Sequence, residues 1–149
     1  MAASTIRRTL GIAAIAAGAL LATTPAAMAD AAPQLTVTPS TNLTDGQQVA
    51  VNATGFTPGD SVTAVQCSTG EWPNVKCDLA DAPTPVTADA NGAAALTLTV
   101  RSSFEGADPT TGDPAGTVDC TVAPGCDVRG GSQTDPSGVF APPVPITFG

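Results

Sequence analysis

The segment from Ser61 to Cys77 most constrains how this chain folds, because a strand pattern runs directly into a loop enclosed by two cysteines. Residues 61–67 (SVTAVQC) alternate in a way that is typical of a half-buried β-strand. The following loop contains Trp72, the only tryptophan of the chain. A tryptophan here can pack over a Cys67–Cys77 bridge or line a binding cleft, and the residues leave both roles open.

The first 29 residues have the pattern of a secretory signal peptide. Arg7 and Arg8 provide a positive start, and residues 10–22 are small and apolar. An Ala-x-Ala cleavage site follows at residues 27–29. Glycines interrupt the apolar stretch, which argues against an uncleaved membrane anchor. We therefore expect a secreted, extracellular protein with one mature domain at residues 30–149.

The mature chain would be strongly acidic. Removing residues 1–29 leaves Lys76, Arg101 and Arg129 against thirteen acidic residues, a net charge of −10. Such a surface repels phosphate backbones and anionic lipids. We therefore expect no direct binding of this protein to nucleic acid, no membrane association, and a monomer. Arg101 is expected to pair with an acidic side chain at the surface.

The absence of histidine removes most catalytic schemes. No histidine can activate a serine, and Lys76 is the one lysine available for a Ser–Lys site. Two acidic pairs remain for a hydrolase or a cation site, Asp78 with Asp81 and Asp108 with Asp113, but both lie in proline-containing segments typical of turns. We predict no enzyme activity, no catalytic cofactor and no metal.

Four cysteines in an exported chain are most simply two disulfides. Of the three possible pairings, Cys67–Cys77 with Cys120–Cys126 fits best, because each pair lies within one loop. Closing such loops contributes roughly 2–3 kcal/mol each. A zinc site is the alternative, but the chain has neither Cys-x-x-Cys spacing nor histidine.

Short strand patterns separated by turn signals continue along the mature chain, which shows no apolar period typical of a helix. Asn91-Gly92 predicts a tight hairpin turn with positive φ inside residues 86–100. Residues 104–116 are expected to form a flexible acidic loop. Strands at this spacing indicate an antiparallel sandwich with a thin aliphatic core, in which Phe104 and Phe148 are core or strand-end residues. The predicted strands are 34–38, 48–54, 61–67, the two runs within 86–100, 117–121 with 126–129 as its possible return, and 144–148.

Several motifs occur in a fixed order through most of the mature chain. They are TVTPS at 36–40, Val65-Gln66-Cys67 with a ten-residue step to Cys77, VTADANG at 86–92, LTVRSSFEG at 98–106, GTVDC at 116–120 and PITF at 145–148. This ordered set, together with the cysteine spacing, resembles the neocarzinostatin family of antibiotic apoproteins.

The resemblance implies an all-β fold, a seven-stranded antiparallel immunoglobulin-like sandwich with a small two-stranded ribbon and two disulfides. It also implies that a cleft between sandwich and ribbon holds an enediyne chromophore non-covalently. The protein would protect and carry this molecule, and the released chromophore would cut DNA, which explains the antibacterial, antitumour and DNA-binding labels of the family. By position, the residues expected to line the cleft are Gln66, Cys67, Trp72, Val75, Cys77, Ala107, Pro109, Asp127 and Gly131.

The expected cleft has few aromatic residues. Where relatives place aromatic side chains after the SFEG motif, this chain has Ala107-Asp108-Pro109. Trp72 is therefore nearly the only aromatic candidate for ligand contact. The sparse lining supports a second hypothesis, a secreted immunoglobulin-like module that binds a protein or cell-wall partner and carries no chromophore.

Overall fold

Nine β-strands make up the regular structure of residues 31–135 and 138–149, the part of the chain that the computed structural model describes. The predicted signal peptide lies outside these residues and stays a prediction. The strands are β1 (Gln34–Thr38), β2 (Gln47–Thr54), β3 (Ser61–Ser68), β4 (Val86–Thr87), β5 (Ala94–Val100), β6 (Ser103–Ala107), β7 (Pro114–Asp119), β8 (Cys126–Ser132) and β9 (Val144–Ile146).

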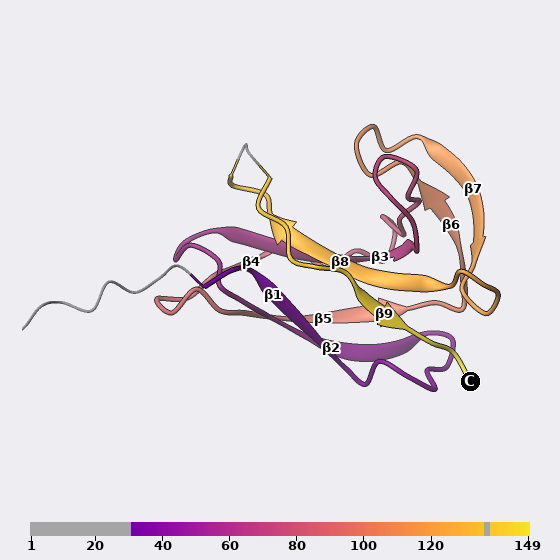
Figure 1. The fold of residues 1–149 in the computed structure, drawn as a ribbon, viewed down its shortest axis with the longest axis horizontal. Coiled ribbons are helices and arrows are strands. Elements are labelled where there is room, and N and C mark those ends of the chain that lie inside the picture. Colours follow the sequence, from indigo (N-terminus) through magenta and orange to yellow (C-terminus); the bar gives the residue numbers. More distant parts are fainter. Residues whose placement is uncertain (1–30, 136–137) are drawn as a thin grey trace, which may run out of the picture.

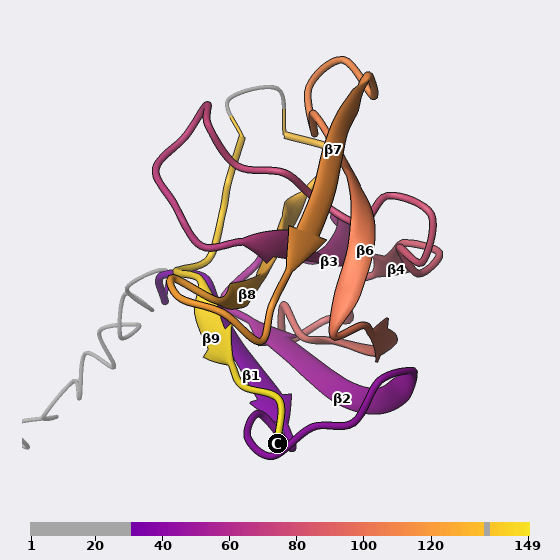
Figure 2. The same ribbon diagram turned by 90° about the vertical axis from the view of Figure 1, so that its right-hand side faces the viewer.

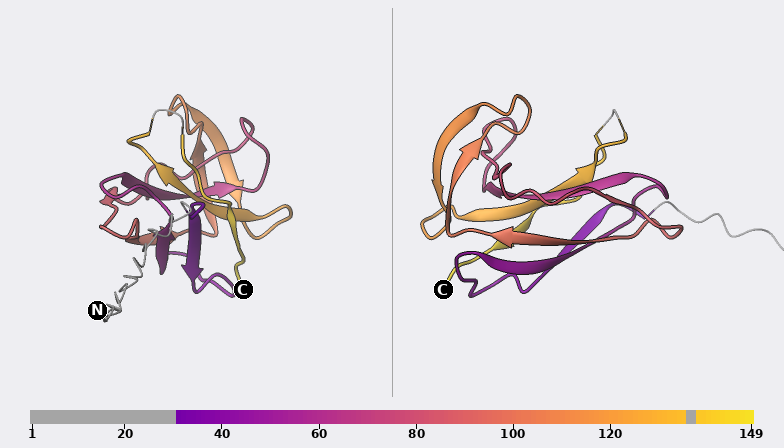
Figure 3. Two further views of the ribbon diagram at one scale, coloured as in Figure 1. Left: turned by 60° about the vertical axis from the view of Figure 1, so that its left-hand side comes forward. Right: turned by 180° about the vertical axis from the view of Figure 1, so that it is seen from behind.

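The strands are arranged as two facing sheets and a separate ribbon (Figure 1). One sheet has the order β1–β2–β5 and the other β4–β3–β8–β9. The β6–β7 ribbon stands at one end of the sandwich, at a steep angle to both sheets (Figures 2 and 3). All pairs between these strands are antiparallel. The predicted all-β sandwich with a small ribbon is therefore confirmed.

The core between the sheets is aliphatic because alternate strand positions point inward. On the three-stranded sheet, Val49 of β2 lies opposite Leu98 of β5, and Val51 lies opposite Leu96. All four side chains are buried. Phe104 at the start of the ribbon is buried as well, in agreement with the prediction that it is a core residue.

Both disulfides have the predicted local pairing. Cys67 is bonded to Cys77, and Cys120 is bonded to Cys126. Because all four sulfur atoms are used in these bonds, the alternative of a zinc site is wrong.

The prediction of a hairpin within residues 86–100 is wrong, although the turn itself is present. β4 pairs with β3 and β5 pairs with β2, so the segment crosses from one sheet to the other. Of the turn residues, Gly92 has a positive φ of 73° and Asn91 does not. A Cβ atom at Gly92 would lie 2.1 Å from the carbonyl oxygen of Phe56. The glycine is thus required by a close contact between chain segments as well as by the turn.

The predictions for residues 104–129 also need correction. Residues 104–116 are mainly ribbon, since β6 pairs with β7 and places Phe104 opposite Val118. β8 is not the return of β7, because it pairs with β3 and β9 in the large sheet. Of the acidic residues that suggested a flexible loop, Asp108 and Asp113 lie at the turn of the ribbon and Glu105 lies on β6. The strands of the ribbon also carry the buried Phe104 and Val118.

A buried glutamine joins the sandwich to the ribbon. The side chain of Gln66 on β3 is fully buried. Its Nε2 donates to the carbonyl oxygen of Arg101 at 2.7 Å, and the Arg101 amide donates to Gln66 Oε1 at 2.8 Å. Nε2 also lies 3.1 Å from the sulfur of Cys120. Arg101 connects β5 to β6, so these bonds fix where the ribbon leaves the sandwich. The Arg101 guanidinium pairs with Asp81 at 2.6 Å, as predicted.

Candidate ligand-binding cleft

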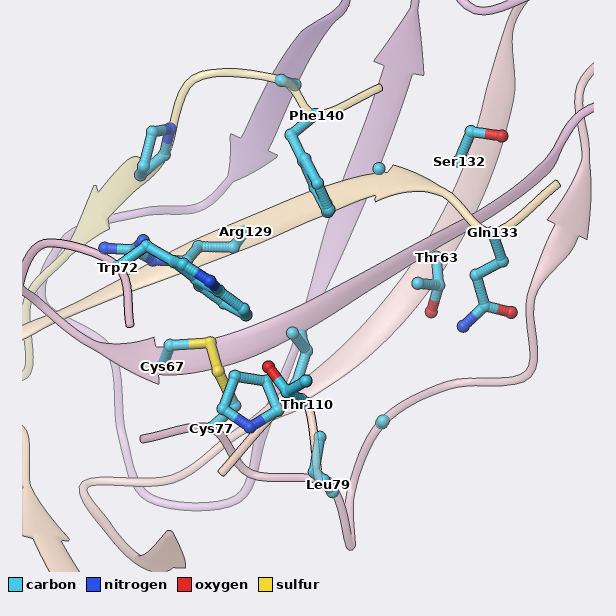
Figure 4. Close-up of a pocket in the computed structure, with 17 residues that line it drawn as sticks. Thr63, Cys67, Trp72, Cys77, Leu79, Thr110, Arg129, Ser132, Gln133 and Phe140 are labelled. Atoms are coloured by element: carbon cyan, nitrogen blue, oxygen red, sulfur yellow. A yellow bond between two sulfur atoms is a disulfide. The ribbon is translucent and has the colours of Figure 1, made fainter. Parts of the chain in front are cut away.

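A cleft of about 630 Å³ lies over the outer face of the large sheet, next to the ribbon (Figure 4). Its volume is within the range of small-molecule sites. The residues that line it come from strands β3 and β8, the loop before Cys77, the segment from Cys77 to Ala82, the ribbon turn and the segment before β9. They are Thr63, Val65, Cys67, Trp72, Cys77, Leu79, Ala82, Pro109, Thr110, Arg129, Gly130, Gly131, Ser132, Gln133, Phe140, Ala141 and Pro143.

The floor of the cleft follows from the alternation along β3. Thr63, Val65 and Cys67 face the cleft, whereas the residues between them turn toward the core. In the register with β8, Thr63 lies opposite Gly131 and Val65 lies opposite Arg129. One face of this strand pair therefore belongs to the core and the other to the cleft.

Cys77 connects the floor of the cleft to the ribbon. Its sulfur is bonded to Cys67 at the end of β3. Its backbone amide and carbonyl exchange two 2.9 Å hydrogen bonds with Ala107 at the end of β6. These links hold the ribbon turn, with Pro109 and Thr110, beside the cleft.

Large exposed apolar side chains gather at this cleft. Among the described residues there are four, and three of them line it: Trp72, Leu79 and Phe140, which are 56%, 41% and 69% exposed. Figure 4 shows Phe140 directed from the C-terminal segment toward β8. Exposed apolar groups concentrated in a hollow indicate a binding site. An exposure above one half also means that Trp72 is not a core residue.

Arg129 is the one charged residue in the lining of the described cleft. Its Nε donates to Asp127 Oδ1 at 2.8 Å and its Nη2 to Asp127 Oδ2 at 3.0 Å. The carboxylate offsets the positive charge of the guanidinium, so the cleft carries little net charge.

The structure brings five of the nine predicted lining residues together in the cleft. These are Cys67, Trp72, Cys77, Pro109 and Gly131.

The other four predicted residues lie outside the lining. Gln66 points into the core, and Val75 is buried against the Cys67–Cys77 disulfide. Ala107 contributes its backbone to the pairing with Cys77. Asp127 is on the cleft face of β8, but only 3% of it is exposed and its carboxylate binds Arg129.

Phe140, the most exposed aromatic residue at the cleft, is not among the residues predicted from the sequence. A signal was present in Gly130-Gly131, because glycine inside a strand often marks the close approach of another group. A Cβ atom at Gly131 would lie 2.5 Å from Phe140 Cδ1 and 2.7 Å from the carbonyl oxygen of Val139. Gly131 therefore makes room for the Phe140 segment against β8.

Replacing Gly131 with alanine is expected to lower the free energy of unfolding by about 1–3 kcal/mol, the usual cost of overpacking. The carbonyl of Val139 is backbone and has to move. Urea unfolding measures the effect. Gly70→Ala is a suitable comparison, because a Cβ there would meet nothing closer than 3.7 Å. Equal stability of Gly131→Ala and the wild type would contradict the proposed contact.

The Asp108 carboxylate holds the ribbon turn at the edge of the cleft. Its Oδ1 accepts the amide hydrogens of Thr110 at 2.7 Å and Thr111 at 3.1 Å. These hydrogen bonds favour the charged form and lower the pKa of Asp108. Stability from this turn is thus fully present above the unfolded-state pKa near 4 and is lost as the pH falls through the folded-state pKa.

We expect a carbon-13 NMR titration to place the pKa of Asp108 below its value in urea-unfolded protein, which should lie near 4. The amide signal of Thr110 should shift with the same midpoint, because its donor loses the charged acceptor. A folded-state pKa at or above the unfolded value would show that the carboxylate does not hold the turn.

The described residues contain no grouping of three or more acidic, cysteine or histidine side chains that is arranged to hold a metal ion. In the same part of the chain, no helix has the length and apolar character needed to cross a membrane.

Comparison with known proteins gives matches to one family. The model of the neocarzinostatin family matches residues 35–148. The chain is 45% identical to macromomycin of Streptomyces macromomyceticus over 105 residues, which cover 70% of this chain and 72% of macromomycin. It is 37% identical to the antitumor antibiotic C-1027 apoprotein of Streptomyces globisporus over 129 residues, 87% and 85% of the two chains.

Solved structures agree with these sequence matches. Macromomycin superposes with a TM-score of 0.65 at 42% identity, covering 79% of this chain and 100% of macromomycin. Apokedarcidin superposes with a TM-score of 0.58 at 32% identity, covering 80% of this chain and 100% of apokedarcidin. The family match extends over most of the chain and includes the strands and loops that build the cleft, so this chain belongs to the neocarzinostatin family.

Proposed function

We propose that this protein is a secreted apoprotein that binds, protects and carries a small hydrophobic chromophore of the enediyne type, after removal of residues 1–29. The observation that carries the proposal is the concentration of Trp72, Leu79 and Phe140 in one cleft of about 630 Å³. Family membership supports it, and one relative is named as the apoprotein of an antitumor antibiotic.

The chemistry of the lining suits a reactive guest. The lining residues of the described cleft include no acid, no lysine and no free thiol, because Cys67 and Cys77 are bonded to each other. Nucleophilic attack on a bound molecule is therefore disfavoured, and apolar walls exclude water. The role is that of a carrier rather than a catalyst.

The acidic charge fits a carrier whose guest acts elsewhere. With a mature net charge of −10, the protein repels DNA, so DNA would be the target of the released chromophore and not of the protein. We expect a monomer outside the cell, with antibacterial and cytotoxic activity that depends on the guest.

Removing either aromatic side chain of the cleft should weaken guest binding. With N-phenyl-1-naphthylamine as a neutral planar probe, Trp72→Ala and Phe140→Ala should each raise Kd about tenfold, equivalent to ~1.4 kcal/mol. In the wild type, the probe should also quench Trp72 fluorescence. Val122→Ala provides the control, since Val122 is equally exposed but lies outside this cleft. Unchanged Kd in both aromatic variants would remove them from the site.

Purification from the producing organism, in the dark and cold, tests the function itself. A co-purifying small molecule with ultraviolet absorbance, released by organic solvent, is the expected result. A clean polypeptide mass without such a molecule would instead favour the secreted module that binds a protein or cell-wall partner.

A further inference from the structure

The loop formed by residues 70–75, called the Trp72 loop below, has few attachments to the rest of the protein. At its C-terminal end, Val75 is buried against the Cys67–Cys77 disulfide. One hydrogen bond connects the described residues 70–75 to another part of the chain, from Arg129 Nη2 to the carbonyl oxygen of Gly70 at 2.7 Å. The bond from the Asn74 amide to the Glu71 carbonyl stays inside the loop.

The guanidinium that makes this bond is itself fixed. Asp127 and Arg129 are two residues apart on β8 and share its cleft face. The carboxylate accepts two hydrogen bonds from the guanidinium, at 2.8 and 3.0 Å. The two side chains are only 5% and 20% exposed, so water competes little for these bonds. A forked, charge-assisted pair of this kind holds its geometry better than a lysine could.

We infer that Asp127 and Arg129 form a clamp that fixes the Trp72 loop over the cleft and thereby sets how fast a guest leaves. The statement about the rate of guest release rests on the proposed function. Arg129 and Asp127 are positioning residues in this scheme, and Trp72 makes the contact. A wall that is ordered before binding loses less conformational entropy when the guest arrives, and changes of this kind alter koff more than kon.

The first test uses the protein without a guest. Trp72 is the only tryptophan, so its fluorescence reports on the loop alone. Arg129→Lys keeps the charge but cannot reproduce the fork, and Asp127→Asn removes one acceptor. Both should increase acrylamide quenching and lower the fluorescence anisotropy of Trp72. Arg101→Lys is the matched control, because it alters the other arginine–aspartate pair of the described residues, and neither Arg101 nor Asp81 lines the cleft.

The second test measures release of N-phenyl-1-naphthylamine by stopped-flow fluorescence. Arg129→Lys and Asp127→Asn should each raise koff about tenfold with little change in kon. The double variant should be no faster than the faster single variant, because both act through one clamp. Additive effects, or koff values equal to that of the Arg101→Lys control, would overturn the clamp.

The two tests separate this inference from the proposed function. If the wild type fails to bind the probe while the Trp72 signal still responds to Arg129→Lys, the carrier function fails and the clamp stands. If the probe binds but quenching and anisotropy stay at wild-type values, the clamp is wrong and the carrier function stands. Loss of the folded circular dichroism spectrum in both single variants would also overturn the clamp, since the pair would then support the whole fold.

Discussion

Replacing both Cys67 and Cys77 with alanine is expected to lower the free energy of unfolding by about 3 kcal/mol and to weaken guest binding. The stability loss comes from the freedom that the unfolded chain regains when a loop with a sequence separation of 10 is opened. The loss of binding has a separate cause. Cys77 pairs with Ala107 of the ribbon through its backbone, and the disulfide is its covalent attachment to β3. Without the disulfide, this wall of the cleft is held to β3 only by backbone hydrogen bonds such as those from Ser68 to Lys76 and from Asp78 to Gln66.

The second disulfide provides the matched control for this variant. Cys120 and Cys126 close a loop with a separation of 6, and neither residue lines the cleft. Their replacement with alanine should cost about 2 kcal/mol in urea unfolding and leave the Kd for N-phenyl-1-naphthylamine within about threefold of the wild type. Equal losses of affinity in the two double variants would mean that binding follows overall stability and not the position of the ribbon.

Replacing Gln66 with leucine is expected to lower the free energy of unfolding by about 2–4 kcal/mol, although leucine is more hydrophobic. The change removes the partners of both the amide and the carbonyl of Arg101, and an unpaired buried backbone group costs about 1–3 kcal/mol. Because Arg101 connects β5 to β6, guest affinity should fall as well.

Gln48→Leu is the control for the buried glutamine. Gln48 lies on β2 with its side chain exposed, so the same exchange there should change stability by no more than about 0.5 kcal/mol in urea unfolding. A Gln66→Leu protein as stable as the Gln48→Leu protein would show that the Arg101 backbone finds other partners and that the bridge is dispensable.

The sequence was sufficient to predict the strands that alternate clearly and the covalent bonds within loops. β1, β2, β3 and β9 lie where the alternation placed them, with small differences at their ends. A strand with period two shows which side chains share a face. It does not show which strand lies beside it. For this reason alternation predicts a hairpin within residues 86–100 and pairing of residues 126–129 with residues 117–121, and the structure has neither.

The residues of the cleft also divide into those that the local sequence predicts and those that it does not. Trp72 and the Cys67–Cys77 bridge were foreseen because they lie within one short segment. Phe140 was not, because it meets Gly131 only when the segment that contains Phe140 lies back along β8 in the folded protein. Gln66 was expected at the ligand and is found in the core, because a polar residue can be buried where backbone groups of another segment satisfy its amide.

The sequence by itself determined the class of the fold, the two disulfides and the family, since these depend on local alternation, local spacing and the order of motifs. The tertiary structure alone decided that Trp72, Leu79 and Phe140 share one cleft, and that Arg129 binds both the Asp127 carboxylate and the Gly70 carbonyl. The physical reason is that burial and hydrogen bonding are satisfied between segments far apart in the chain. The face that each residue presents is therefore fixed only when the two sheets and the ribbon are in place.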